Sequence, residues 1–390
     1  MDIALRYARS KGDKYHEYFI EAQLNVLDRI LEGEPYYAST FYIPGEWTPL
    51  LDRPVLYMER ISGFAAANRL VRHLSDKRVQ ASTPGCDCTY QLMFQCLLDE
   101  GLIPPPSGYL AMSYACNNAF SFSKASAARY DVPCYSINVP RIPNMHTISD
   151  LGRSLARMGA SLNVCLDSDR LTNAIKLSNS ALAIKNQIDQ LRILYPGILD
   201  ATDGFKLFTI YNDLGSNHAV AVLEQLLATI EKRISGYRPP LGSKWIWLGV
   251  IPLYRNNLLM ETECRLGGRF VYEELFSFGD LEPIQADSFY KDLARRIVNS
   301  HFFSVQRRAD FIMDIAAKMG VEGIVCFSQR NCSFLPPTVP YLRRTLKSTG
   351  MAFMDFTGDV IDPNYFDEGK YWLTMEEWTG MQNGGACRVR

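Results

Sequence analysis

Histidine is scarce in this sequence, and the motifs of several common enzyme classes are missing. Only five histidines occur among 390 residues, and none forms a His-x-x-x-His pair of the kind that binds zinc on a helix. The sequence also contains no Gly-x-x-x-x-Gly-Lys-Ser/Thr phosphate loop, no Gly-x-Gly-x-x-Gly dinucleotide turn and no Gly-x-Ser-x-Gly elbow. A histidine metal site, an ATP or NAD site and a serine hydrolase are therefore not indicated.

The sequence also has no excess of positive or negative charge and no long apolar segment. The 41 Lys and Arg residues nearly balance the 42 Asp and Glu residues, so the formal net charge is -1. No basic field of the kind that attracts nucleic acid is present. No apolar stretch reaches membrane-spanning length, and residues 1–14 mix charged and apolar side chains unlike a signal peptide. We therefore expect a cytoplasmic protein that binds neither nucleic acid nor membranes.

Helical and strand-like patterns alternate along the chain in two separate regions. An amphipathic helix is predicted over residues 15–31. The first alternation comprises a helix at 89–100, a strand at 109–112, a helix at 118–129 and a strand at 132–139. In the second, strands are predicted at 244–251, 269–275, 323–327 and 352–356, and helices at 305–319 and 338–347. Such βαβ alternation favours parallel sheets.

The patterns also suggest where the chain divides. Two helices, at 168–194 and 219–234, separate the alternating regions, and a cluster of Pro239, Pro240 and Gly242 indicates a linker. We predict an N-terminal helical segment over 1–40, a first α/β domain over 41–165, a helical connector over 166–238 and a second α/β domain over 239–390.

The ten cysteines contain no Cys-x-x-Cys pair, and in a reducing cytoplasm they are not expected to form a disulfide framework. Four of them lie within apolar patterns and are predicted to pack in the core: Cys96, Cys134, Cys165 and Cys264. Cys387 lies in a Gly-rich C-terminal tail.

Cys86, Cys88, Cys116 and Cys332 have turn-like surroundings, where a thiol can be directed at a metal. Cys116 and Cys332 each follow a predicted strand, and open α/β sheets bind ligands beyond the carboxyl ends of their strands. The helix predicted after Cys116 would favour its thiolate through the helix dipole. Spacing by itself leaves the nature of the site open.

The segments that hold these cysteines resemble the 2-hydroxyacyl-CoA dehydratase and benzoyl-CoA reductase family, and the similarity runs through most of the chain. Three blocks carry it: Cys88-Thr89-Tyr90-Gln91, Ala115-Cys116-Asn117 and Asn331-Cys332-Ser333. The resemblance implies two flavodoxin-like (Rossmann-like) parallel-sheet domains plus helical segments. It also implies a [4Fe-4S] cluster on Cys88, Cys116 and Cys332 at the inter-domain cleft, with Cys86 as a possible additional ligand.

The reaction implied by the resemblance is a radical elimination of water from an (R)-2-hydroxyacyl-CoA, which would make the protein a hydro-lyase. One electron would convert the thioester carbonyl into a ketyl radical anion, and hydroxide would leave from C2. Loss of the C3 proton and return of the electron would then give the 2-enoyl-CoA. The family also implies two protein partners: a second, homologous dehydratase subunit and an ATP-dependent iron-sulfur activator.

A catalytic carboxylate is also implied. The segment Tyr42-Ile43-Pro44-Gly45-Glu46 resembles the Pro-Glu-Glu block of the family, so Glu46 is the candidate acid or base. The alternative is that Glu46 is an exposed loop residue without a catalytic role. The sequence departs from the family at Gly45, which replaces the first acid of the block, and at Ser333, which replaces a common Asp.

Two other functions are compatible with the sequence. One is an ATP-dependent reductase of the same family, either similar to benzoyl-CoA reductase or holding a double-cubane [8Fe-9S] cluster, for which Cys86 and Cys326 would be the residues to examine. The other is a non-catalytic, metal-stabilised interaction protein in which the thiols are structural.

Overall fold

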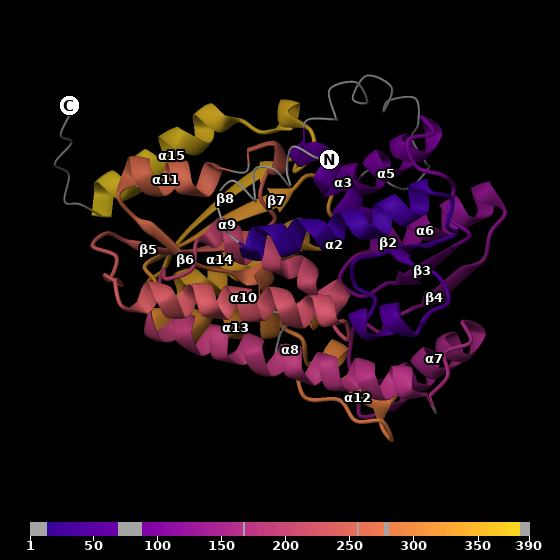
Figure 1. The fold of residues 1–390 in the computed structure, drawn as a ribbon. Helices are drawn as coiled ribbons and strands as arrows, with labels where there is room; N and C mark the ends of the chain where they lie inside the picture. Colours follow the sequence, from indigo (N-terminus) through magenta and orange to yellow (C-terminus); the bar gives the residue numbers. More distant parts are fainter. Residues whose placement is uncertain (1–13, 69–87, 167, 256, 277–280, 383–390) are drawn as a thin grey trace.

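Two four-stranded parallel sheets form the centre of the protein (Figure 1). The structure is a computed structural model, and it describes residues 14–68, 88–166, 168–255, 257–276 and 281–382. We call each sheet with its accompanying helices a unit. In each unit, the strand that comes second in sequence lies at one edge of the sheet, and the first, third and fourth strands follow it in that order. This order is that of flavodoxin-like folds. The predicted α/β class with two flavodoxin-like parallel sheets is therefore confirmed.

The first sheet has the order β2-β1-β3-β4. Its strands are β1 (Tyr37–Ser39), β2 (Val55–Tyr57), β3 (Gly108–Met112) and β4 (Cys134–Ile137). The residues of β1, β2 and β3 are all buried, as expected for parallel strands covered on both faces. The accompanying helices are α3 (Met58–Ala67), α5 (Thr89–Asp99), α6 (Asn117–Tyr130) and α7 (Thr147–Ser161).

The second sheet has the order β6-β5-β7-β8. Its strands are β5 (Lys244–Gly249), β6 (Arg269–Glu273), β7 (Gly323–Gln329) and β8 (Ala352–Gly358). The accompanying helices are α11 (Leu258–Leu266), α13 (Val305–Met319), α14 (Leu335–Lys347) and α15 (Glu368–Gln382). Helix α14 begins at Leu335, three residues earlier than predicted. Its first turn contains prolines, which are tolerated there because the N–H groups of a first turn have no acceptor within the helix.

Further helices join the two sheets. Helices α8 (Asp169–Leu194) and α10 (Asn217–Ile234) run along one side of the molecule, and α2 (Lys14–Leu31) lies beside α10 (Figure 1). In the sequence, α9 (Ala201–Leu207) and the 3-10 helix η3 (Phe208–Asp213) lie between α8 and α10. Helix α12 (Phe289–Asn299) follows β6 in sequence but packs against α7 of the first unit.

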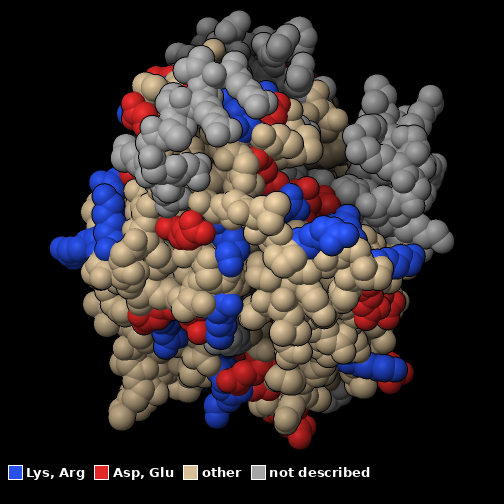
Figure 2. Space-filling view, turned by 90° about the vertical axis from the view of Figure 1, so that its left-hand side faces the viewer, with Lys and Arg blue, Asp and Glu red and all other residues tan. Residues whose placement is uncertain are grey.

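Apolar side chains of both sheets meet in one core. A single buried cluster contains Tyr109 of β3 and Phe94 of α5 together with Trp247 of β5 and Phe327 of β7. The surface is mixed in charge: Figure 2 shows Lys and Arg interspersed with Asp and Glu on the face that it displays. Among the described helices, none has the length and apolar character needed to cross a bilayer.

Candidate active site

Cys88, Cys116 and Cys332 each lie at the beginning of a helix. Cys88 is the residue before α5 and is buried, whereas Cys116 is the residue before α6 and is half-buried. Cys332 follows β7 and lies three residues before α14. The N-terminal end of a helix carries a partial positive charge, which favours a thiolate or another anion beside it. Cys86 lies outside the described residues.

The backbone directs Cys116 and Cys332 in similar ways. Cys116 Sγ accepts a hydrogen bond from the backbone N–H of Ala119 over 3.4 Å. Cys332 Sγ accepts from two backbone N–H groups, those of Phe334 and Leu335, over 3.4 and 3.5 Å. These amides partly offset the charge of a thiolate in either position, as groups that hydrogen-bond to metal ligands do.

The residue before each of these cysteines has left-handed backbone geometry. Ala115 has a φ of 55° and Asn331 a φ of 58°. This conformation is uncommon for residues other than glycine and costs roughly 1–2 kcal/mol for an L-residue. Both loops that hold a thiol therefore contain a strained backbone residue directly before the cysteine.

Hydrogen bonds connect the three cysteine segments. Asn118, two residues after Cys116, donates through Nδ2 to the backbone oxygen of Asn331 over 2.8 Å. Thr89, the residue after Cys88, accepts a hydrogen bond from Gln329 Nε2 over 3.0 Å. The loop that holds Cys332 is thus tied to the starts of both α5 and α6.

The pKa values of two tyrosines are raised in part by the cysteine side chains. Burial, together with the nearby thiols of Cys116 and Cys332, raises the pKa of Tyr42 well above its ordinary value. Burial, the thiol of Cys88 and the carboxyl of Glu59 raise the pKa of Tyr90, and Cys332 contributes in the same direction. The phenols of both residues therefore lie in the neighbourhood of the three cysteines and remain protonated near neutral pH.

The three cysteine sulfurs are donors of the kind that iron-sulfur clusters use. Within the described ranges, no group of three or more His, Cys, Asp or Glu side chains could hold one metal ion. Cysteines that hold a cluster bind different iron atoms, so their sulfurs need not converge on one point. Three thiols from separate segments, beside helix N-termini and backbone amides, suit a negatively charged cluster.

Glu46 is buried, so the alternative of an exposed loop residue is wrong. It lies in the 3-10 helix η1 (Gly45–Leu50) with an exposed fraction of 1%. Glu46 Oε1 accepts hydrogen bonds from Ser178 Oγ over 2.7 Å and from Arg296 Nη1 over 2.5 Å. This carboxylate is therefore engaged in an ion pair that connects η1 with α8 and α12.

The structure also explains the glycine beside Glu46. A Cβ atom at Gly45 would lie 2.3 Å from the backbone oxygen of Tyr211 in η3. No side chain fits without displacing that backbone, so the first acid of the Pro-Glu-Glu block has no room here.

Glu59, in the first turn of α3, is a carboxylate that the sequence did not reveal. Its Oε1 accepts from Gln91 Nε2 over 3.1 Å, whereas its Oε2 is buried and forms no hydrogen bond of normal geometry with the described residues. Burial raises the pKa of Glu59 to about 7, against the opposing effect of nearby backbone amides and the Gln91 side chain. Glu59 also contributes to the raised pKa values of Tyr42 and Tyr90, so it lies in the same neighbourhood as the cysteines.

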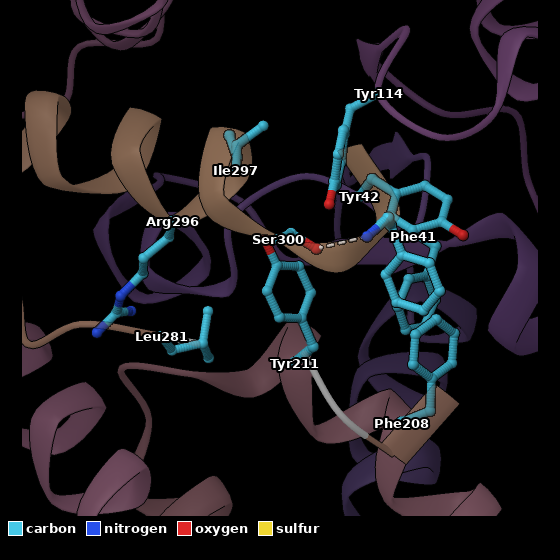
Figure 3. Close-up of a pocket in the computed structure, with 10 residues that line it drawn as sticks. Phe41, Tyr42, Tyr114, Phe208, Tyr211, Leu281, Arg296, Ile297 and Ser300 are labelled. Atoms are coloured by element: carbon cyan, nitrogen blue, oxygen red, sulfur yellow. Dashed lines mark hydrogen bonds between the residues drawn. The ribbon is translucent and has the colours of Figure 1, made fainter. Parts of the chain in front are cut away.

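A small cavity borders this neighbourhood (Figure 3). Its volume is about 20 Å³, which is sufficient for one ordered water molecule. Tyr42 and Tyr114 line it, with their rings edge to face and 5.4 Å apart, and Phe41 stacks on Phe208 at 3.9 Å. Arg296 lies on the side of the cavity opposite that stack. Most of the lining is thus aromatic.

A comparison with protein families identifies the chain. The model of the family described as "2-hydroxyglutaryl-CoA dehydratase, D-component" matches residues 65–371, which include all three cysteines. The chain belongs to this dehydratase family. A search of the curated proteins finds no match. The matched residues begin after Glu46 and Glu59, so the family match itself does not extend to either carboxylate.

The other cysteines of this dehydratase-family chain have mixed positions. Cys96 is buried, as predicted, and Cys134 is half-buried. The prediction of core packing is wrong for Cys165 and Cys264, which are exposed. Cys264 lies on the face of α11 opposite its buried residues, and Cys165 is an exposed residue that follows a buried one in the segment between α7 and α8.

Cys326, the residue considered for a double-cubane cluster, lies in the middle of β7 with an exposed fraction of 0%. Burial raises its pKa to about 12. Cys326 lies inside the strand, whereas Cys332 lies in the loop that follows it. Cys387 lies outside the described residues.

Proposed function

We propose that this dehydratase-type subunit is the iron-sulfur subunit of an (R)-2-hydroxyacyl-CoA dehydratase, with a [4Fe-4S] cluster on Cys88, Cys116 and Cys332. The observation that carries the proposal is the position of these cysteines: Cys88 and Cys116 directly precede helices, Cys332 accepts a hydrogen bond from the first residue of α14, and hydrogen bonds join the three segments. When bound, such a cluster would supply single-electron chemistry and an iron atom that acts as a Lewis acid toward a substrate oxygen.

The protein's contribution at the cysteines is electrostatic. The backbone N–H groups of Ala119, Phe334 and Leu335 face the sulfurs of Cys116 and Cys332 and offset their negative charge. Such hydrogen bonds raise the reduction potential of iron-sulfur centres by stabilising the more negative state.

Removal of the C3 proton requires a base, and we assign this role to Glu59. Its pKa of about 7 is close to the working pH of a cytoplasmic enzyme, which is the range in which a general base is most effective. Its carboxylate lies beside Gln91 Nε2 and the backbone amides of Glu59 and Phe41, which lower its pKa, but burial is the larger effect. Glu46, the candidate from the sequence, is held by Arg296 and Ser178, and these contacts favour a role in positioning η1.

The partners and the location follow from the same proposal. The substrate is an acyl-CoA, and the electron comes from a separate ATP-dependent iron-sulfur activator, in agreement with a sequence that has no phosphate loop. A second, homologous subunit completes a heterodimer in the cytoplasm.

The test is the iron and acid-labile sulfide content of protein purified without oxygen. About four of each per chain are expected, with loss of iron in Cys88→Ala, Cys116→Ala and Cys332→Ala. The matched control is Cys264→Ala, which alters an exposed thiol on α11 and should leave the iron content unchanged. Colourless anaerobic protein without iron would refute the proposal and favour the non-catalytic interaction protein.

The same measurement distinguishes the reductase alternative. A double-cubane protein would contain about eight iron atoms per chain and would lose part of them in Cys326→Ala. The position of Cys326 in the middle of β7, rather than in the loop after the strand that holds Cys332, argues against its use as a ligand.

A further inference from the structure

A buried hydrogen-bonded junction joins the two α/β units beside the cysteines. Its members are Thr89, the first residue of α5, Gln329, the last residue of β7, and Asp359, the residue after β8. Their exposed fractions are 4%, 4% and 1%. Thr89 follows Cys88 directly, and Gln329 precedes Cys332 by three residues.

The Thr89 hydroxyl uses both of its hydrogen-bonding roles across this boundary. It donates to Asp359 Oδ1 over 2.8 Å and accepts from Gln329 Nε2 over 3.0 Å. A hydroxyl offers one donor and two acceptor positions, so a buried hydroxyl with partners of both kinds has a defined orientation.

Both partners of the hydroxyl are themselves fixed to the backbone. Asp359 Oδ1 also accepts from the backbone N–H groups of Ile361 and Asp362, over 2.9 Å each. Gln329 Oε1 accepts from the backbone N–H of Val360 over 2.7 Å. The start of α5 is therefore attached to a loop at the carboxyl end of the second sheet that three side chain–backbone hydrogen bonds hold in place.

We propose that Thr89, Gln329 and Asp359 form a latch that sets the separation of Cys88 and Cys332. Cys88 belongs to the first unit and Cys332 to the second, so the distance between their thiols depends on how the units are docked. A site built from two units is only as well defined as the contacts that support it. Thr89 is thus a positioning residue, and its effect on a cluster rests on the function proposed above.

Three substitutions separate the latch from ordinary packing. Thr89→Val keeps the shape of the side chain and removes both hydrogen bonds, whereas Thr89→Ser keeps the hydroxyl. The control is Thr262→Val, because Thr262 is also a fully buried threonine, with its hydroxyl bonded to the Leu258 backbone oxygen and to the Tyr371 hydroxyl over 2.8 and 2.7 Å.

The first measurement uses full-length protein from which metal has been removed by a chelator. A short bismaleimide is added, and the yield of the Cys88–Cys332 cross-link is determined by mass spectrometry of peptides. We expect wild type, Thr89→Ser and Thr262→Val to give similar yields, and Thr89→Val to lose most of the cross-link. Circular dichroism and the thermal midpoint verify that the variants are folded.

The second measurement is the rate at which iron-loaded protein releases iron to a chelator. Loss of a supporting contact around a metal site costs about 10- to 100-fold in affinity, so Thr89→Val should release iron about tenfold faster or more, and Thr89→Ser should restore slow release. The latch is refuted if the Thr89→Val protein releases iron at the wild-type rate. It is also refuted if its rate differs from wild type no more than that of Thr262→Val does.

The two proposals fail in different ways. A cross-link that depends on the Thr89 hydroxyl in a protein that never takes up iron would support the latch and refute the iron-sulfur function. If the iron content depends on the three cysteines but cross-linking and iron release do not depend on Thr89, the iron-sulfur function would be supported and the latch refuted.

Discussion

Replacing Glu59 with Gln is the most direct test of the proposed chemistry, because it removes a titrating group while leaving the side-chain shape unchanged. Burial raises the pKa of Glu59 to about 7, from an ordinary value of 4.5. A base must be deprotonated to accept the C3 proton, so activity should increase with pH through this value. Glu59→Gln should abolish that dependence.

The size of the effect follows from the pKa. With a pKa of about 7, the deprotonated fraction rises from about 0.1 at pH 6 to about 0.9 at pH 8, so kcat/KM should rise about tenfold over this interval. A carboxyl at 4.5 would already be deprotonated at pH 6 and would give a flat profile. A positioned base contributes about 10²–10⁴ in rate, so Glu59→Gln should lower kcat by that factor, about 2.7–5.5 kcal/mol of barrier.

The assay is anaerobic formation of the enoyl-CoA from a 2-hydroxyacyl-CoA at saturating activator, followed by chromatography between pH 6 and 8. Glu46→Gln, measured in parallel, should retain the pH dependence because Glu46 is engaged with Arg296 and Ser178. Iron content should be unchanged in both variants. A Glu59→Gln protein that keeps the tenfold rise, or a wild-type profile that is flat, would refute the assignment of the base.

Three further predictions concern other parts of the structure. Arg296→Met leaves the Glu46 carboxylate buried without its cation and should lower the free energy of unfolding, measured with urea, by about 3–5 kcal/mol; recovery in the double variant with Glu46→Gln is expected, and its failure would argue against a pair effect. Gly45→Ala brings a Cβ atom to within 2.3 Å of a backbone oxygen and should cost about 1–3 kcal/mol in the same assay, so an unchanged urea midpoint would contradict the geometry. Cys326→Ala should leave iron per chain unchanged, and a clear decrease would revive the larger cluster.

Regular elements with a long pattern were predictable from the sequence. The helix predicted over residues 305–319 has those bounds in α13, where Ser304 caps the N-terminus and Gly320 takes the left-handed conformation at the C-terminus. The strand predicted over 323–327 is the start of β7, which extends two residues further. In these segments the local pattern and the tertiary packing favour the same structure.

Strands β1 and β2 were not predicted, for a physical reason. Each has three residues, which is too short for an alternating pattern, and each is stabilised by parallel pairing within the sheet, β1 with both β2 and β3. Their place in the fold depends on neighbours that are distant in sequence.

The candidate site was predictable only in part. Turn residues and the family resemblance indicated Cys88, Cys116 and Cys332, because the signal lies in the residues next to each cysteine. The environments of the carboxylates arise from long-range contacts: the partners of Glu46 are 132 and 250 residues away in sequence, and the partner of Glu59 is 32 residues away. No local pattern reports such contacts.

The shared core has a consequence for the history and engineering of this chain. Trp247 and Phe327 of the second sheet belong to the same apolar cluster as Phe94 and Tyr109 of the first unit. Recombination that exchanged one half for the half of a relative would leave mismatched side chains throughout this cluster, and close-packed interiors tolerate such mismatches poorly. Despite its two similar sheets, the protein is not modular, and its halves have to be inherited and replaced together.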